Sequence, residues 1–140
     1  MGDYAIRMQF DMDAPEEAVE RSLATEDGIR SWWTNHADLR GARLETGFPD
    51  VPQPFEFAVR RSGDATEWVT GGFPPWWAGT TIRWRVERNP DGPGSRVHFE
   101  HGGYEPDNPV IPIVTPAWAQ IILRLKDHAE TGRPDPFFSF

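Results

Sequence analysis

The sequence contains no cysteine, and this absence excludes several classes of site at once. Thiol nucleophiles, cysteine-ligated zinc and iron–sulfur clusters all require that residue, and so does a fold stapled by disulfides. The first residues lack the basic start and apolar run of a secretory signal. No apolar run approaches the roughly 20 residues that cross a bilayer. These absences predict a cytoplasmic protein with no membrane span.

Positive charge is also scarce. The chain has 14 Lys and Arg against 22 Asp and Glu, which gives a formal net charge of -8. The basic residues are scattered, and no run is longer than Arg60-Arg61. A nucleic-acid surface needs a clustered positive footprint, so the sequence predicts no nucleic-acid partner. The acidic balance favours solubility and does not identify a partner.

Aliphatic core residues are few, whereas tryptophan is abundant. Only 38% of the residues are hydrophobic, yet 13% are aromatic and seven are tryptophans. A chain of 140 residues is of ordinary single-domain size and buries roughly two-thirds of its unfolded surface. We therefore expect one domain over residues 1–140, in which large flat side chains pack around a cavity or form an interface.

Apolar and polar residues alternate in several segments, and this period of two predicts half-buried strands. The segments are 4–10, 55–60, 65–70, 80–88 and 95–101. The Pro- and Gly-rich segment 89–94 is typical of a hairpin connection. Two short helices are expected between the first two of these strands, over 13–23 and from an N-cap at Thr25 to Trp33.

A long amphipathic helix is expected near the C-terminus. Thr115 is predicted to cap it, with Pro116 at its first position and Thr131-Gly132 at its end. Its apolar stripe consists of Trp118, Ile121, Ile122, Leu125 and Ala129. Because a sheet with one apolar face must cover that face, this helix is predicted to pack against the sheet.

Four segments in this order resemble the START-like, or SRPBCC, superfamily, and within it the branch of homologues of the activator of heat-shock-protein-90 ATPase. They are APEEAVERSLATEDGIRSWW, WAGTTIRW, RVHFEHGGY and WAQIILRLKDHAETGRPDP, which together span nearly the whole chain. The resemblance implies an α+β helix-grip fold, in which a curved antiparallel sheet wraps around the C-terminal helix and encloses an apolar cavity.

The resemblance also implies a function, namely binding of a hydrophobic small molecule between the sheet and that helix. Two alternatives stand beside it. One is a cyclase, aromatase or dehydratase acting in the cavity, and the other is a chaperone-linked stress or interaction protein. Fold similarity alone does not transfer function. Neither a cofactor nor a catalytic constellation is predicted.

Eight residues are the predicted cavity lining. They are Trp33, Phe57, Trp68, Trp84, Phe99, His101, Trp118 and Ile122. The simpler interpretation of each aromatic residue is that it fills the core. Together, rigid indoles beside a helix favour a cleft that accepts a flat apolar guest.

His101 is the polar member of that set. By strand alternation it shares the inward face of Phe99, where it either bonds a backbone group or acts as a general acid/base. No inward carboxylate is evident beside it, and the structural role is favoured. His98 and His101 lie on opposite faces of one strand, so they cannot share an ion and no metal site is predicted.

Two further aromatic groups remain. One of Trp76 and Trp77 is expected to cap the cavity mouth or the start of the next strand. The alternative for the pair is an exposed partner patch, because adjacent apolar residues on a turn cannot both point inward. Phe137, Phe138 and Phe140 make a poor free tail, and they either fold back on the domain or dock on a second subunit as a homodimer interface.

Overall fold

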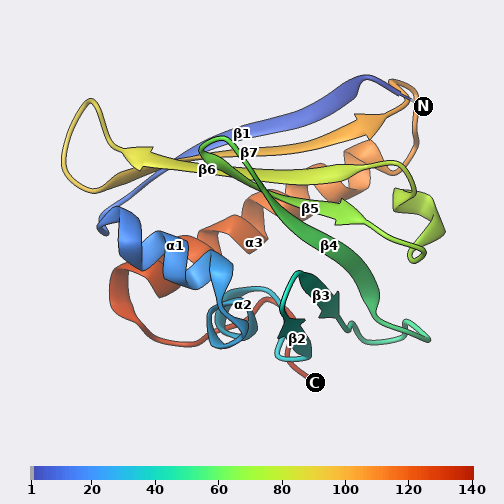
Figure 1. Cartoon of the computed structure of the whole chain (residues 1–140), viewed down its shortest axis with the longest axis horizontal. Helices are drawn as coiled ribbons and strands as arrows, with labels where there is room; N and C mark the ends of the chain where they lie inside the picture. The colour runs from blue at the N-terminus through green and yellow to red at the C-terminus, as the bar shows by residue number, and fades with distance from the viewer. Residues whose placement is uncertain (1) are drawn as a thin grey trace.

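The computed structural model describes residues 2–140, which form one curved sheet and three α-helices (Figure 1). The elements in chain order are β1 (Tyr4–Met12), α1 (Glu16–Ala24), α2 (Glu26–Trp32), β2 (Ala37–Arg40), β3 (Arg43–Thr46), β4 (Phe55–Ser62), β5 (Ala65–Thr70), the 3-10 turn η1 (Pro75–Trp77), β6 (Thr81–Arg88), β7 (Ser95–Tyr104) and α3 (Ile111–Thr131). The fold class is α+β, and the predicted helix-grip architecture is confirmed.

The seven strands form one antiparallel sheet in the order β1-β7-β6-β5-β4-β3-β2. Both ends of the sheet come from the N-terminal third of the chain, because β1 pairs with β7 while β2 lies at the opposite edge. In Figure 1, β4 bends away from the long strands towards β3 and β2, and α3 runs beneath the sheet. The helix contacts β1, α1 and α2, so it is held along its length.

The predicted alternation of the central strands is confirmed. Ile82 and Trp84 of β6 are buried, as are their β7 partners His101 and Phe99. The intervening side chains form ion pairs across the outer face, where Glu67 accepts from both Arg60 and Arg83 at 2.7 and 3.0 Å. Such exposed pairs contribute little each, and they keep the outer face solvated.

The N-terminus of α2 also agrees with the sequence. The Oγ1 atom of Thr25 accepts a hydrogen bond from the Gly28 N–H at 3.0 Å, which satisfies one of the free donors of the first turn. The helix ends at Trp32, and the two consecutive indoles of Trp32 and Trp33 both enter the core. This short helix therefore anchors two of the largest buried side chains.

The predicted start of α3 is wrong by five residues. The helix begins at Ile111, and Thr115 does not cap it but donates to the Ile111 carbonyl one turn back, at 2.6 Å. The start is fixed earlier by Asn108, whose side chain accepts from the Val110 N–H at 2.9 Å. Pro116 therefore lies inside the helix, close enough to its start that the missing N–H disturbs only its first turns. The predicted end is confirmed, since Gly132 follows Thr131 with a φ of 75°.

The C-terminal tail folds back on its own domain. The N–H groups of Phe137 and Phe138 donate to the carbonyls of Trp32 and Trp33 at 3.0 and 2.9 Å, and Phe138 forms a parallel bridge with Thr34. The ring of Phe140 stacks on His36 with 4.0 Å between centroids. The tail thus packs beside α2 and ends near β2, at the C label of Figure 1.

Candidate functional site

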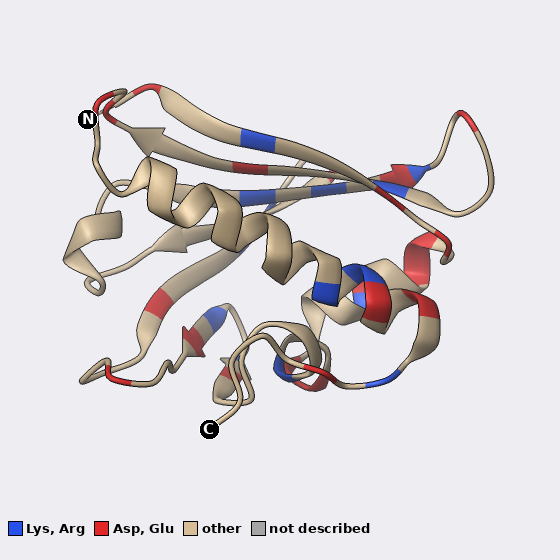
Figure 2. Ribbon diagram, turned by 180° about the vertical axis from the view of Figure 1, so that it is seen from behind, with Lys and Arg blue, Asp and Glu red and all other residues tan. Residues whose placement is uncertain are grey.

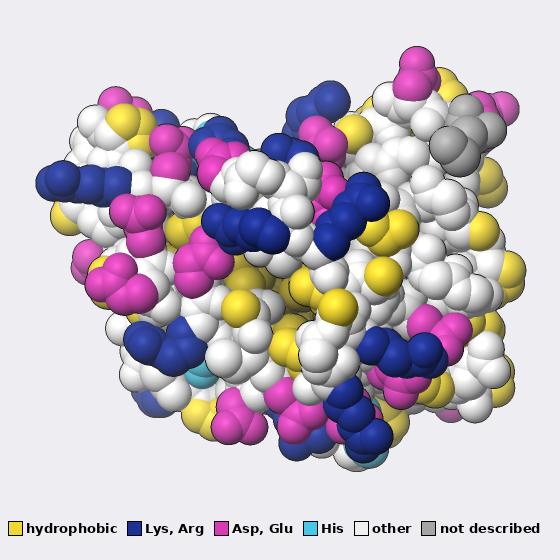
Figure 3. Space-filling model, viewed as in Figure 1, with side chains coloured by type: hydrophobic (Ala, Val, Ile, Leu, Met, Phe, Trp, Pro, Cys, Tyr) yellow, Lys and Arg dark blue, Asp and Glu magenta, His cyan; other side chains and the backbone are white. Residues whose placement is uncertain are grey.

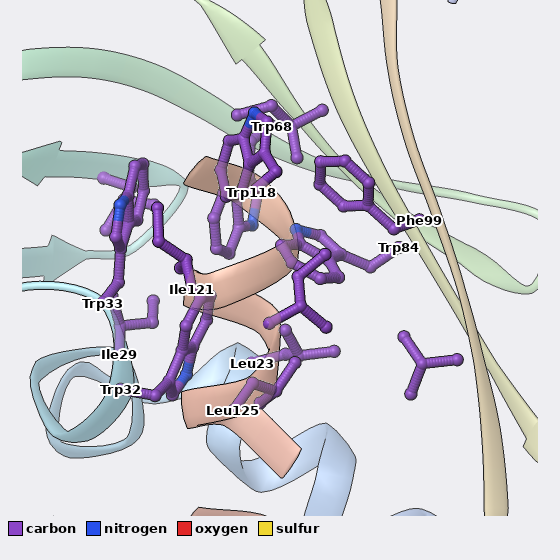
Figure 4. Packing of buried hydrophobic residues seen from close by; sticks show 14 of the residues in the cluster. Leu23, Ile29, Trp32, Trp33, Trp68, Trp84, Phe99, Trp118, Ile121 and Leu125 are labelled. Atoms are coloured by element: carbon purple, nitrogen blue, oxygen red, sulfur yellow. The ribbon is translucent and has the colours of Figure 1, made fainter. Parts of the chain in front are cut away.

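The interior is a cluster of contacting indoles. Six of the seven tryptophans are buried, and Trp76 is the exposed one. Trp33 stacks on Trp68 with 5.8 Å between centroids, and Trp118 stacks on Trp77 at 6.1 Å. Figure 4 shows the labelled rings converging over α3 from α2 and from the sheet. These separations lie within the range of about 4.5–7 Å at which aromatic pairs attract, so the cluster is a packed core.

All eight residues that were predicted to line the cavity are buried, but the structure divides them. Trp33 and Trp118 line an open pocket at one end of the cluster. Trp68 borders a different hollow, beside α1. The remaining five, namely Phe57, Trp84, Phe99, His101 and Ile122, are buried, and Phe99 also borders a hollow on the outer face of β1, β7 and β6. Ligand contact by any of the eight stays a prediction.

The open pocket has a volume of about 270 Å³ and lies between α3, η1, the loop before β4 and the C-terminal tail. Its lining consists of Trp33, Phe48, Pro49, Val51, Phe55, Trp76, Trp77, Val114, Ala117, Trp118, Ile121 and Phe138. The adjacent indoles of η1 point in different directions: Trp77 is buried and Trp76 is 46% exposed at the rim. We call this space the α3–η1 pocket.

None of the described residues that line the α3–η1 pocket carries a charge. The helix contributes to this, because α3 has no Asp, Glu, Lys or Arg before Arg124. Figure 2 shows the same asymmetry, with the charged residues of α3 confined to its C-terminal turns. A charged group in such a site would lose its hydration without gaining a partner, so the pocket favours an uncharged guest.

His101 stands behind the inner wall of the pocket, in a closed hydrogen-bond network. The indole Nε1 of Trp118 donates to its Nδ1 at 3.0 Å, and because an indole N–H can only donate, Nδ1 is the acceptor. The neutral ring then carries its proton on Nε2, which donates to Thr80 Oγ1 at 3.0 Å. Thr80 in turn donates to the Trp77 carbonyl at 2.7 Å. The network therefore holds the indole of Trp118 and the main chain of Trp77, whose own indole stacks on that of Trp118.

The same burial restricts what His101 can do chemically. Removal from water lowers the pKa of His101 to about 3, so the ring is neutral at physiological pH. The hydroxyl of Tyr104 lies 3.1 Å from Nδ1, and burial raises the pKa of Tyr104 above its ordinary value. Both side chains are almost fully shielded from solvent. This histidine is suited to positioning Trp118 and Thr80.

Sequence reasoning missed most of the pocket lining. Phe48, Phe55 and Phe138 come from a loop, a strand start and the tail, and no local spacing relates them. Val114 could have been found, because it lies four residues before Trp118 on the same helix face. Thr80 is the first residue of the predicted strand 80–88 and Tyr104 follows the predicted strand 95–101; the contact of Thr80 with His101 depends on the pairing of β6 with β7.

Comparison with solved structures identifies the architecture. The Aha1 dimer from Colwellia psychrerythraea matches with a TM-score of 0.79 and 25% sequence identity, covering 92% of this chain and 98% of that chain. The chain has the START-like helix-grip fold. Its resemblance to the branch of homologues of the activator of heat-shock-protein-90 ATPase is thereby supported, and α3 is the helix that the START-like sheet grips.

Two further structures share the START-like fold at lower identity. SSP2350 from Staphylococcus saprophyticus matches with a TM-score of 0.73 and 15% identity, covering 96% of this chain and 98% of that chain. DynU16, from the dynemicin biosynthetic locus, matches with a TM-score of 0.75 and 17% identity over 99% of this chain but only 51% of its own. No protein-family model and no curated protein matches the sequence.

Two absences concern the described residues only. No helix among residues 2–140 is long and apolar enough to cross a membrane. Within the same range, no group of three or more His, Asp or Glu side chains is arranged to hold a metal ion. His98 lies on the outer face beside Glu87, away from the buried His101, as the alternation predicted.

Proposed function

We propose that the protein binds an uncharged, apolar small molecule in the α3–η1 pocket. The observation that carries this proposal is the pocket lining, which is aromatic and aliphatic throughout and opens beside the exposed Trp76. Small-molecule sites are typically concave and mostly apolar, with volumes from about 300 Å³ upwards, and this pocket lies at the small end. A compact guest of one or two rings fits that size.

The rigidity of the inner wall supports the same function. Trp118 and Trp77 are stacked on each other and held from behind by the His101–Thr80 network. A wall that keeps its shape without the ligand lowers the cost of binding, because little side-chain freedom remains to be lost. The pocket is therefore preorganised for a flat guest.

The test is to fill the pocket. In the Ala117→Phe variant a ring would occupy the space beside Trp118, so affinity for Prodan, a neutral dye built on two fused rings, is expected to fall at least tenfold. Ala58→Phe makes the same change at an exposed position on the outer face of β4, and it should leave the affinity unchanged. Equal dye binding by the wild type and both variants would contradict the proposal.

The enzyme alternative has one observation in its favour, the tyrosine beside His101. A cyclase or dehydratase site would need a tyrosine or carboxylate beside His101 inside the cavity. The hydroxyl of Tyr104, 3.1 Å from Nδ1 of His101, lies at such a distance. However, neither residue lines the α3–η1 pocket. Turnover of a polyketide-like substrate that is lost in His101→Gln with dye binding intact would favour the enzyme.

A homodimer remains a proposal for the partner. The Colwellia relative is a dimer, and this chain offers Phe140, which is 52% exposed, at the edge of the folded tail. Phe137 and Phe138 already contact Trp32 and Trp33 of their own domain through the backbone. Sedimentation of the wild type and of Phe140→Ser tests this, since a dimer through the tail should weaken in the variant.

The chaperone-linked role likewise remains a prediction, with Trp76 as its exposed candidate.

A further inference from the structure

A second hollow lies on another side of the molecule, between α1, the turn from β2 to β3, and the hairpin of β4 and β5. Its volume is about 380 Å³, and it shares no lining residue with the α3–η1 pocket. Figure 3 shows a hollow over this part of the surface, with hydrophobic side chains on its floor and Lys or Arg side chains along its upper rim. We call it the α1–β4 groove.

The floor of the α1–β4 groove is apolar. Leu23 of α1 and Ile29 of α2 form one side, and Leu39, Val59 and Trp68 form the other. Of these, Leu39 and Val59 are only partly buried, so they contribute apolar surface that remains in contact with water. A ligand that covered this surface would gain the hydrophobic free energy that folding has left unused.

Arg61 places a positive charge on the concave face of the sheet, beside the α1–β4 groove. Arg61 pairs with Thr66 in the register in which Val59 pairs with Trp68, so residues 59, 61, 66 and 68 share one face. Arg60 points to the other face, where its Nε donates to Glu67 at 2.7 Å. The rim of the groove therefore receives the guanidinium of Arg61, whereas that of Arg60 is engaged on the outer face.

The guanidinium of Arg61 is held in place and still has donors to spare. Its Nη1 donates to Thr66 Oγ1 at 3.0 Å, and its Nη2 donates to the Asp64 carbonyl at 3.1 Å. The nearest carboxylate is that of Glu20, 3.8 Å away, which is too far for a hydrogen bond. A guanidinium carries five N–H groups, so a carboxylate can accept two hydrogen bonds from Arg61 without breaking the two existing bonds.

We propose that the α1–β4 groove binds a small amphiphilic anion, an aliphatic or aromatic monocarboxylate. The carboxylate would bond to Arg61 in place of the distant Glu20, and the apolar body would cover Val59, Leu39 and Trp68. This ligand differs in charge from the guest of the α3–η1 pocket, and the two sites are independent. Glu20 acts as the competitor that the ligand must displace.

Octanoate is the probe, with octanamide as its neutral isostere, and binding is measured by calorimetry at low salt. The wild type is expected to bind octanoate at least tenfold more tightly than octanamide. Arg61→Gln should lower the affinity for octanoate about tenfold, because a charge-assisted hydrogen bond is lost. Glu20→Gln should tighten it about threefold, because a surface ion pair of modest strength no longer competes. Arg61→Lys keeps the positive charge but lacks the paired N–H donors of a guanidinium, so its affinity for octanoate should lie between those of the wild type and Arg61→Gln.

The controls separate this proposal from the proposed function. Arg7→Gln removes an equal charge from the outer face and should leave octanoate affinity unchanged, and Ala117→Phe should weaken Prodan binding but not octanoate binding. Near-UV circular dichroism verifies that each variant is folded. Three results would each overturn the proposal, namely no saturable octanoate binding by the wild type, equal affinities of Arg61→Gln and Arg7→Gln, or an unchanged affinity in Glu20→Gln. Loss of octanoate binding in Ala117→Phe would assign octanoate to the other pocket and would also overturn it.

Discussion

The indole Nε1 of Trp118 donates a hydrogen bond to Nδ1 of His101 across 3.0 Å, joining α3 to strand β7 of the sheet. Both residues are buried, so no water replaces either partner. The Tyr104 hydroxyl lies 3.1 Å from the same Nδ1 atom, so the loss of the indole N–H removes one hydrogen bond, worth about 0.5–1.5 kcal/mol net, without leaving the acceptor unpaired. This hydrogen bond is thus a specific polar contact between α3 and β7 within a largely apolar interface.

Trp118→Phe tests this polar contact. The variant retains a ring but removes the indole donor, so the free energy of unfolding should fall by about 2 kcal/mol, from the lost hydrogen bond together with lost packing, while the Tyr104 hydroxyl still lies within hydrogen-bond distance of Nδ1. Trp77→Phe is the matched control, since the Nε1 of Trp77 is buried without any hydrogen-bond partner among the described residues. In urea denaturation, Trp77→Phe should lower the free energy of unfolding by less than Trp118→Phe does. Equal losses would show that the bond to His101 contributes nothing specific.

Stability should depend on pH through the neutral state of His101. Its folded pKa of about 3 lies below the ordinary value of 6.5, so the unfolded chain binds the proton more readily. This contribution is complete above pH 6.5 and is lost as the pH falls towards 3, at up to about 1.4 kcal/mol per pH unit. Burial also lowers the pKa of His128, which therefore acts in the same direction.

His101→Gln separates the two histidines. The variant should be less stable than the wild type at pH 7 and should lose less stability between pH 7 and pH 5. The window stops at pH 5 because lowered carboxyl pKa values, such as that of Glu67 beside Arg60, add their own loss at more acidic pH. Denaturant midpoints at three pH values measure the slope, and an unchanged slope would contradict the assignment.

Much of this fold could be predicted from the sequence. The alternation of Ile82, Trp84 and Val86 and the capping residue Thr25 are local signals, and local signals are what a single sequence carries. The start of α3 was misjudged because Pro116 is typical of a first helical position, while the turn at Asn108 that begins the helix was overlooked. Strands β2 and β3, of four residues each, are too short to show a period of two.

The pocket was less accessible to sequence reasoning, because its walls are assembled over long distances. Phe48 contacts Phe138 with 5.0 Å between centroids, although 90 positions separate them in the sequence. The aromatic content indicated a cavity or an interface but not which rings would fill the core. Which rings remain at an opening is decided by tertiary packing, such as the stacking of Trp33 on Trp68.

The tail is held to α3 by one arginine. Arg124 donates from Nη1 to the Asp135 carbonyl at 3.0 Å, pairs with the Asp135 carboxylate at 2.9 Å and lies over the Phe137 ring. Arg124→Gln should lower the free energy of unfolding by about 1 kcal/mol or less, because the group is partly exposed. Its clearer effect should be faster proteolytic cleavage of the segment after Gly132. Arg7→Gln, which removes an exposed ion pair far from the tail, should leave that cleavage unchanged.

Gly103 allows β7 to pass close to the turn that carries Thr80. Its φ is 99°, and a Cβ atom there would overlap the carbonyl oxygen of Gly79. Gly103→Ala should therefore destabilise the fold by about 3 kcal/mol or more, since both backbone strain and a clash with main-chain atoms are introduced. Gly63→Ala is the control with a similar positive φ of 62° but open space around it, and it should cost only about 1 kcal/mol in thermal unfolding.

The stack of indoles gives the protein a built-in optical reporter. Chromophores whose centroids lie about 6 Å apart, as in the pairs Trp33–Trp68 and Trp77–Trp118, share their excitation, so light absorbed by one is emitted by the group. Three members of the group, Trp33, Trp77 and Trp118, also form the pocket surface. A guest that quenches or shifts one of them changes the emission of the whole cluster, and ligand screening needs no added label.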